Sequence, residues 1–118
     1  MSRRILAVVH DLFFVAKLQE GARHAGVQLE LAAGAEDLLE KAKAGADLIV
    51  IDVSETNLEA LEAVRRVRES SIGSAVPIFG FVSHVRADLV ERARAAGCDR
   101  VIARSQFTAK LVDFLKGD

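Results

Sequence analysis

The sequence has no tryptophan and no tyrosine, and cysteine, proline and methionine occur once each in 118 residues. Because six phenylalanines carry all the aromatic character, we expect no base-stacking platform for nucleic acid. The single cysteine, Cys98, has no partner for an internal disulfide, which is typical of a reducing compartment. Neither sign of charge is in clear excess, since the chain has 16 basic and 17 acidic residues. This balance gives no indication of nucleic acid or an anionic membrane as a partner.

Long hydrophobic runs are also absent. The apolar run that follows Arg4 stops at His10, which is too short for a signal peptide or a membrane span. No segment reads as a linker or as low-complexity sequence. We therefore expect residues 1–118 to form a single domain in the cytoplasm.

The apolar residues that are present come in short blocks. Four aliphatic residues, 48–51, lie between Asp47 and Asp52, and such a run without alternation predicts a strand buried on both faces. Residues 27–32 alternate instead, as a half-exposed edge strand does. Further strands are predicted over 5–9, 78–82 and 100–103. Gly80, inside one of them, indicates a neighbour that approaches closely.

Apolar residues at helical spacing separate these strands. They predict helices over 12–25, 35–44, 58–69, 89–96 and 107–115. A strand followed by a helix, repeated five times, predicts an α/β fold, a flavodoxin-like (βα)5 doubly wound parallel sheet. The strand order 2-1-3-4-5 places the buried strands in the centre and the alternating strand at an edge.

Polar residues follow the carboxyl ends of these strands, where such sheets place their ligands. The strand order reverses between the first and third strands, so Asp11 and Asp52 should face each other across a crevice. With the backbone carbonyl of Ser54 they would form an oxygen site suited to Mg²⁺. Arg104 arrives at the same edge and can pair with a carboxylate or with a bound phosphoryl group.

Four segments carry a resemblance to a known family. They are residues 47–52, residues 4–11, residues 77–84, and residues 96–107 with their Ala-Gly-Cys-Asp opening. With these segments the whole chain resembles the receiver domain of bacterial two-component response regulators. The resemblance implies that Asp52 accepts a phosphoryl group from a histidine kinase, and that Asp11 helps to hold Mg²⁺.

The sequence departs from that family at several of its functional positions. His10 stands at the first acidic position, which removes a negative charge from the metal site and weakens Mg²⁺ binding. Val82 stands at the hydroxyl position, with Ser83 one residue later. Val101 replaces the aromatic switch residue, and Arg104 with its planar fork replaces the lysine. We hypothesise that Arg104 bridges Asp52 or Asp11 and partly substitutes for Mg²⁺.

Three functions remain open from the sequence. The first is an atypical receiver domain that accepts a phosphoryl group at Asp52 with a degenerate switch. The second is a pseudo-receiver that acts as a phosphorylation-independent interaction module. The third, a small enzyme or nucleotide binder, is disfavoured because no glycine-rich phosphate loop and no nucleophile–base pair is evident. We therefore expect a protein that is not an enzyme.

Simpler interpretations stand beside these. Asp52 could cap a loop, and Asp11 could cap the helix over 12–25. His10, Asp11, Asp52 and His84 could instead hold a transition metal. Only one of Phe13 and Phe14 can face the core. The arginines 65, 66 and 68 are expected on a solvated face.

The expected partners are proteins, either a histidine kinase or a downstream effector, and a homodimer is an alternative. In the family, partners meet the face formed by the fourth helix, the fifth strand and the last helix. Here that face has a basic character from Arg86, Arg92, Arg94, Arg100 and Lys110.

Overall fold

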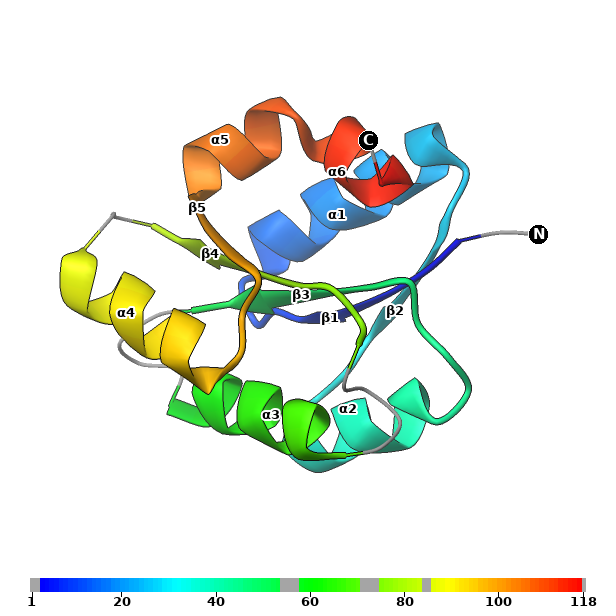
Figure 1. Ribbon diagram of the computed structural model, residues 1–118. Coiled ribbons are helices and arrows are strands. Elements are labelled where there is room, and N and C mark those ends of the chain that lie inside the picture. Colours follow the sequence, from blue (N-terminus) through cyan, green and yellow to red (C-terminus); the bar gives the residue numbers. More distant parts are fainter. Residues whose placement is uncertain (1–2, 54–57, 71–74, 84–85, 118) are drawn as a thin grey trace.

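The computed structural model describes residues 3–53, 58–70, 75–83 and 86–117. Strands and helices alternate along the chain as β1 (Arg4–Val8), α1 (Leu12–Ala25), β2 (Gln28–Leu31), α2 (Ala35–Ala42), β3 (Leu48–Asp52), α3 (Leu58–Glu69), β4 (Ile78–Val82), α4 (Ala87–Ala96), β5 (Arg100–Ala103), α5 (Arg104–Ala109) and α6 (Leu111–Lys116). The five strands form one parallel sheet in the order β2-β1-β3-β4-β5 (Figure 1). The predicted fold class and strand order are confirmed.

Helices cover both faces of this sheet. Helices α1, α5 and α6 lie on one face, and α2, α3 and α4 lie on the other (Figure 1). Residues of β1 alternate between the two layers, since Leu6 and Val8 join one core cluster while Ile5 and Ala7 join the other. Burial on both faces is why the central strands read as continuous apolar runs.

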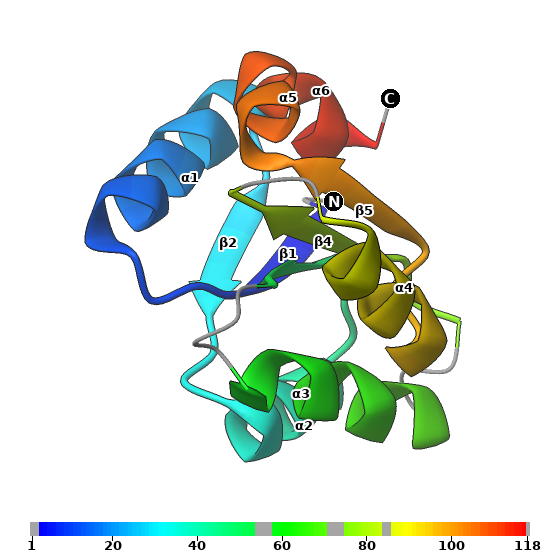
Figure 2. The same cartoon turned by 90° about the vertical axis from the view of Figure 1, so that its left-hand side faces the viewer.

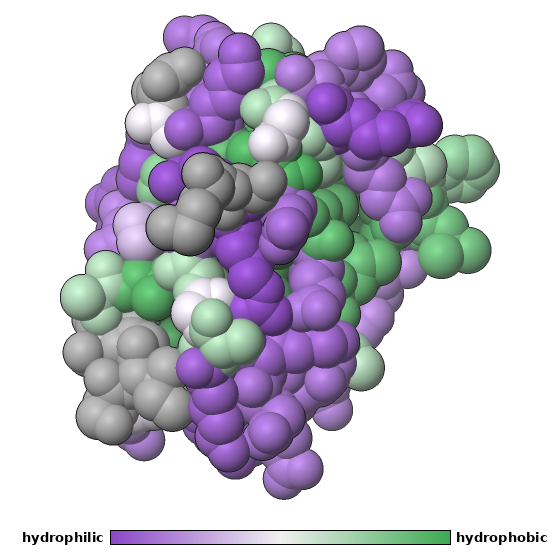
Figure 3. All heavy atoms as spheres, turned by 90° about the vertical axis from the view of Figure 1, so that its right-hand side faces the viewer, coloured by the Kyte–Doolittle hydropathy of each residue, from purple (hydrophilic) through white to green (hydrophobic). Residues whose placement is uncertain are grey.

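Strand β2 is the edge strand that its alternation predicted. Leu29 and Leu31 are half-buried, whereas Gln28 and Glu30 are exposed. A hydrophobic band lies over this edge on an otherwise mostly hydrophilic face (Figure 3). The Lys41 Nζ donates to the carbonyl oxygen of Leu31 at 2.7 Å, so one backbone acceptor of the edge is already occupied. A charged side chain placed there disfavours pairing with another chain.

The glycine within β4 has the close neighbour that its position indicated. A Cβ added at Gly80 would lie 2.9 Å from Val53 Cγ2 and 3.4 Å from Cys98 Sγ. Cys98 is buried and precedes β5, at the edge opposite the carboxyl ends of the strands. Burial raises the pKa of its thiol to about 11, so the reactive thiolate is disfavoured at neutral pH.

Three predictions about helices were wrong, and one of them is the start of α4, which is Ala87 and not residue 89. The last helix is two helices, because the backbone at Lys110 leaves the helical region with φ −121° between α5 and α6. Helix α2 also ends two residues earlier than predicted, at Ala42. No helix in the described ranges is long and apolar enough to span a membrane.

Arg68 was also predicted wrongly, as part of a solvated face. It donates to the carbonyl oxygens of Gly97 at 2.8 Å and Val76 at 2.6 Å, and its guanidinium pairs with Asp99 at 2.5 Å. Its side chain is only 19% exposed. The guanidinium therefore ties α3 to the segments that enter β4 and β5, which is possible because Arg is long and carries several donors.

Candidate functional site

The carboxyl ends of β1, β3 and β5 bring together residues that are remote in the sequence. Figure 2 faces this edge of the sheet. Asp52 is the last residue of β3, Asp11 immediately precedes α1, and Arg104 is the first residue of α5. Neighbouring strands β1 and β3 pair through Val8 and Ile51. The acidic residues therefore lie at the predicted crevice, where the strand order reverses.

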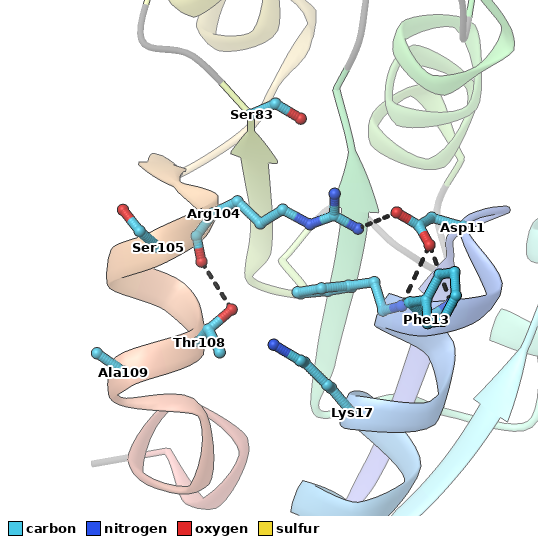
Figure 4. A pocket seen from close by; sticks show the side chains of 9 residues that line it. Asp11, Phe13, Lys17, Ser83, Arg104, Ser105, Thr108 and Ala109 are labelled. Carbon is cyan, nitrogen blue, oxygen red and sulfur yellow. Dashed lines mark hydrogen bonds and ion pairs between the residues drawn. The ribbon is translucent and has the colours of Figure 1, made fainter.

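Asp11 is held through both of its carboxylate oxygens. Its Oδ1 accepts the backbone N–H groups of Phe13 at 2.9 Å and Phe14 at 3.3 Å, which makes it the N-cap of α1. Its Oδ2 accepts a hydrogen bond from Arg104 at 2.6 Å (Figure 4). The Arg104 hydrogen bond is the main reason that the pKa of Asp11 is lowered, with the helix N–H groups adding to it. The capping role is confirmed.

Arg104 lies between an anion and two aromatic rings. Its Cζ is 4.6 Å from the centroid of the Phe14 ring and 5.9 Å from that of Phe81. The two rings pack on each other with centroids 4.4 Å apart. Contact with ring faces and a carboxylate suits a planar guanidinium better than an ammonium group. The hypothesis that Arg104 pairs with one of the two crevice carboxylates is confirmed, and its partner is Asp11.

Asp52 is half-buried at the end of β3. Burial raises the pKa of Asp52 because it disfavours the charged form. The positive charge of Arg104 opposes that shift, and the negative charge of Asp11 adds to it. The three groups thus form one electrostatic unit in which Asp52 ionises less readily than an ordinary aspartate.

The described residues fit a magnesium ion poorly. Both oxygens of Asp11 already accept hydrogen bonds, and His10 offers a nitrogen where this hard ion prefers oxygen. Ser54 and His84, which the sequence placed in the candidate metal sites, lie outside the described residues. Within the described part of the chain, no three His, Cys, Asp or Glu side chains are grouped to hold a metal. A cation at Asp11 would share its Oδ2 with the Arg104 hydrogen bond and would lie close to the positive guanidinium.

The other positions that the sequence singled out differ in how far they are buried. Val82 is 1% exposed and belongs to the core beneath α2, α3 and α4. Ser83 is exposed, and Val101 is half-buried. A valine side chain has no polar atom, so neither Val82 nor Val101 can hydrogen-bond a phosphoryl oxygen.

Sequence reasoning missed a groove between α1 and α5, beside the crevice. It has a volume of about 660 Å³ and is lined by Asp11, Phe13, Phe14, Lys17, Ser83, Arg104, Ser105, Thr108 and Ala109 (Figure 4). Asp52 does not line it. Phe14 is buried in its wall, whereas Phe13 is 87% exposed. The adjacent phenylalanines were the only sequence signal for this groove, because two neighbours on a helix cannot share one face.

The sequence matches no protein-family model and no curated protein. Solved structures of receiver domains do resemble it. The chemotaxis protein CheY4 of Vibrio cholerae has 24% identity and a TM-score of 0.84, covering 99% of this chain and 98% of that one. A CheY-like receiver domain protein of Methanospirillum hungatei has 19% identity and a TM-score of 0.81, covering 99% and 93%.

A third structure carries a metal. The receiver domain of the sensor histidine kinase PA1611 of Pseudomonas aeruginosa, with a magnesium ion coordinated in its active-site cleft, has 22% identity and a TM-score of 0.83. The match covers 99% of this chain and 97% of that one. At these identities the likeness establishes the fold: this chain has the flavodoxin-like fold of CheY-like receiver domains.

Proposed function

We propose that this protein is an atypical receiver domain of phosphorelay signalling, not an enzyme, in which Asp52 is the phosphoryl acceptor. In this proposal Arg104 supplies the positive charge at the acidic crevice that a divalent cation supplies elsewhere. One observation carries the proposal. The Arg104 guanidinium donates a hydrogen bond to Asp11 at 2.6 Å, beside the Asp52 carboxylate at the end of the central strand β3.

The proposed chemistry is a single group transfer. A carboxylate oxygen of Asp52 attacks phosphorus, an O–P bond forms, and the bond between phosphorus and the donor's leaving group breaks. The leaving group departs with the electron pair. Arg104, which acts electrostatically on Asp52, would offset the added negative charge on the phosphoryl oxygens.

Acetyl phosphate tests this proposal directly. Incubation with the wild-type protein should add one phosphoryl group per chain that hydroxylamine removes, read by intact mass, and release acetate. Asp52→Asn should abolish the adduct, while Asp47→Asn, which changes a carboxylate at the other end of β3, should leave it unchanged. No adduct on the wild-type protein, with or without added Mg²⁺, would contradict the acceptor role.

A second function is favoured by the positions around Asp52. Val82 is buried and Val101 is half-buried, and neither of these two positions carries the hydroxyl or the aromatic side chain that the resemblance associates with switching. On this alternative the domain binds its protein partner with Asp52 unmodified. Partner affinity that is equal for the wild-type protein and Asp52→Asn, before and after acetyl phosphate, would favour it.

A further inference from the structure

The groove beside the crevice has the size and the walls of a small-molecule site. Its volume of about 660 Å³ lies within the range of roughly 300–1,000 Å³ that such sites have. Phe14 is buried in its wall, and Phe13 at its rim is 87% exposed. Ala109 lines it from α5. Much of the lining is therefore apolar, and an aromatic ring stands open to solvent beside it.

Two cationic side chains line the same groove from different helices. Lys17 extends from α1 toward α5, and Arg104 is the first residue of α5 (Figure 4). Among the described residues that line the groove, the one carboxylate is Asp11, and it already accepts a hydrogen bond from Arg104. Lys17 makes no ion pair with the described residues. One uncompensated positive charge therefore lies beside an apolar wall.

Arg104 adds hydrogen-bond donors whose position is fixed. Its guanidinium is held by the hydrogen bond to Asp11 at 2.6 Å and by the Phe14 ring, whose centroid lies 4.6 Å from Cζ. A guanidinium has five N–H donors in a planar fork that matches phosphate and carboxylate oxygens. Within the described part of the chain, the Arg104 side chain donates to Asp11 alone. Donors therefore remain for the oxygens of a ligand.

We propose that this groove binds a small aromatic anion, in which a flat ring is joined to a phosphate or a carboxylate. The ring would lie against Phe13 and the apolar wall. The anionic group would pair with Lys17 and accept hydrogen bonds from Arg104. Asp52 does not line the groove, so this binding does not rest on phosphoryl transfer at that residue.

Both parts of such a ligand contribute to its binding. An exposed ion pair contributes little in water because its charges are solvated and screened, so inorganic phosphate alone would bind weakly. A neutral ring would gain only the apolar contact and would leave Lys17 unpaired. A ring that carries an anion makes both contacts while it loses its freedom of motion only once. We therefore expect aromatic anions to bind in preference to their neutral analogues.

The fluorescent probe 8-anilinonaphthalene-1-sulfonate tests the proposal, and N-phenyl-1-naphthylamine, which lacks the sulfonate, is its matched neutral control. Because the chain has no tryptophan and no tyrosine, the probe emission is measured without overlap from the protein. We expect one saturable site per chain for the anionic probe. The neutral probe should bind about tenfold more weakly, the effect of losing one charge interaction. Equal affinities for the two probes would overturn the proposal.

Matched variants locate the site. Phe13→Ser and Lys17→Glu should each weaken binding of the anionic probe by about tenfold or more. Leu12→Ser, which is similarly exposed but outside the groove, and Lys116→Glu on α6 should change it by less than about twofold. Lys17→Glu should leave the affinity for the neutral probe unchanged, which separates a lost charge from an altered fold. No saturable site, or equal effects of Lys17→Glu and Lys116→Glu, would overturn the proposal.

Competition with two unlabelled pairs identifies the anionic group. Adenosine 5′-monophosphate is compared with adenosine, and 1-naphthoate with 1-naphthamide. Displacement of the probe by an anion and not by its neutral partner supports the proposal and distinguishes phosphate from carboxylate. Displacement by the neutral partners to the same extent, or by neither anion, overturns it. The probe should bind Asp52→Asn as it binds the wild-type protein, so the result is independent of the acceptor role.

Discussion

Arg104 and Asp11 are 93 positions apart in the sequence, and their side chains meet at 2.6 Å at the carboxyl edge of the sheet. The ion pair joins the start of α5 to the start of α1. It also occupies one oxygen of the carboxylate that the receiver resemblance assigned to a metal. The consequences for metal affinity, for ionisation and for phosphoryl chemistry at Asp52 can be measured separately.

The first prediction concerns metal affinity. Arg104→Ala frees Asp11 Oδ2 and leaves two acidic side chains without their neighbouring cation, so Mg²⁺ should bind more tightly. We expect a gain of about tenfold, comparable to one charge–charge interaction in a partly solvated site. Calorimetric titration with MgCl₂ provides the measurement. The double variant Arg104→Ala/Asp11→Asn is the control and should lose the gain. Unchanged affinity in Arg104→Ala would mean that the ion pair does not exclude the metal.

The second prediction concerns pH. The pKa of Asp52 is raised above its ordinary 3.8 by burial, so the folded protein binds this proton more tightly than the unfolded chain. Ionisation of Asp52 therefore opposes folding. The penalty is absent below pH 3.8, grows as pH rises through the raised folded pKa, and is complete above it. Asp52→Asn should raise the urea midpoint at pH 7 more than near pH 4.

Asp11 should behave in the opposite way, because its pKa is lowered. Its contribution to stability is present above the unfolded pKa and is lost as pH falls through the folded value. Asp11→Asn retains a good helix cap and removes the charge. It should therefore lower the urea midpoint at pH 7 and have less effect in acid. A pH-independent difference for both variants would contradict these assignments.

The third prediction concerns Arg68. Arg68→Ala removes donors from the Gly97 and Val76 carbonyls and leaves Asp99 without this partner. The free energy of unfolding should fall by about 2–4 kcal/mol, the range for lost charged hydrogen bonds in a largely buried position. Arg65→Ala is the control, because Arg65 is 54% exposed and meets Glu62 only at 3.4 Å. It should change stability by less than about 1 kcal/mol. Equal losses of unfolding free energy for the two variants would mean that the Arg68 contacts stabilise the fold no more than an exposed ion pair does.

The fourth prediction concerns the close approach at Gly80. Gly80→Ala places a methyl group 2.9 Å from Val53 Cγ2, so the free energy of unfolding should fall by about 1–3 kcal/mol as the core is overpacked. Val53→Ala makes space and should recover part of the loss in the double variant, beyond what additivity gives. Strictly additive losses in chemical denaturation would mean that the clash is relieved elsewhere.

The positions of the backbone were largely readable from the sequence. The end of β3 is marked by an apolar run that stops at Asp52, and the end of β1 is marked in the same way by the polar residues that follow it. A strand–helix pattern repeated along the chain allows few topologies. The turn at Lys110 was not readable, because Phe107, Leu111 and Phe114 keep helical spacing across it. All three side chains are buried in the structure with two helices, as they would be in a single helix. Hydrophobic periodicity therefore cannot distinguish one helix from two.

Side-chain pairing was less predictable than backbone position. The sequence placed Arg104 at the acidic edge but left Asp11 and Asp52 as alternative partners, and only packing on Phe14 resolves the choice. Arg68 reaches Gly97 and Asp99, which are 29 and 31 positions away. No local pattern encodes such a contact, because it depends on how α3 lies against β4 and β5.

The central claim is that Asp52 accepts a phosphoryl group at a crevice whose cation is Arg104. Beryllofluoride, which mimics that group on a carboxylate, tests it by amide NMR with and without Mg²⁺. We expect shifts at Asp52 and Arg104 that saturate, that need little or no Mg²⁺, and that vanish in Asp52→Asn. Spectra unchanged by saturating beryllofluoride and Mg²⁺ would contradict it.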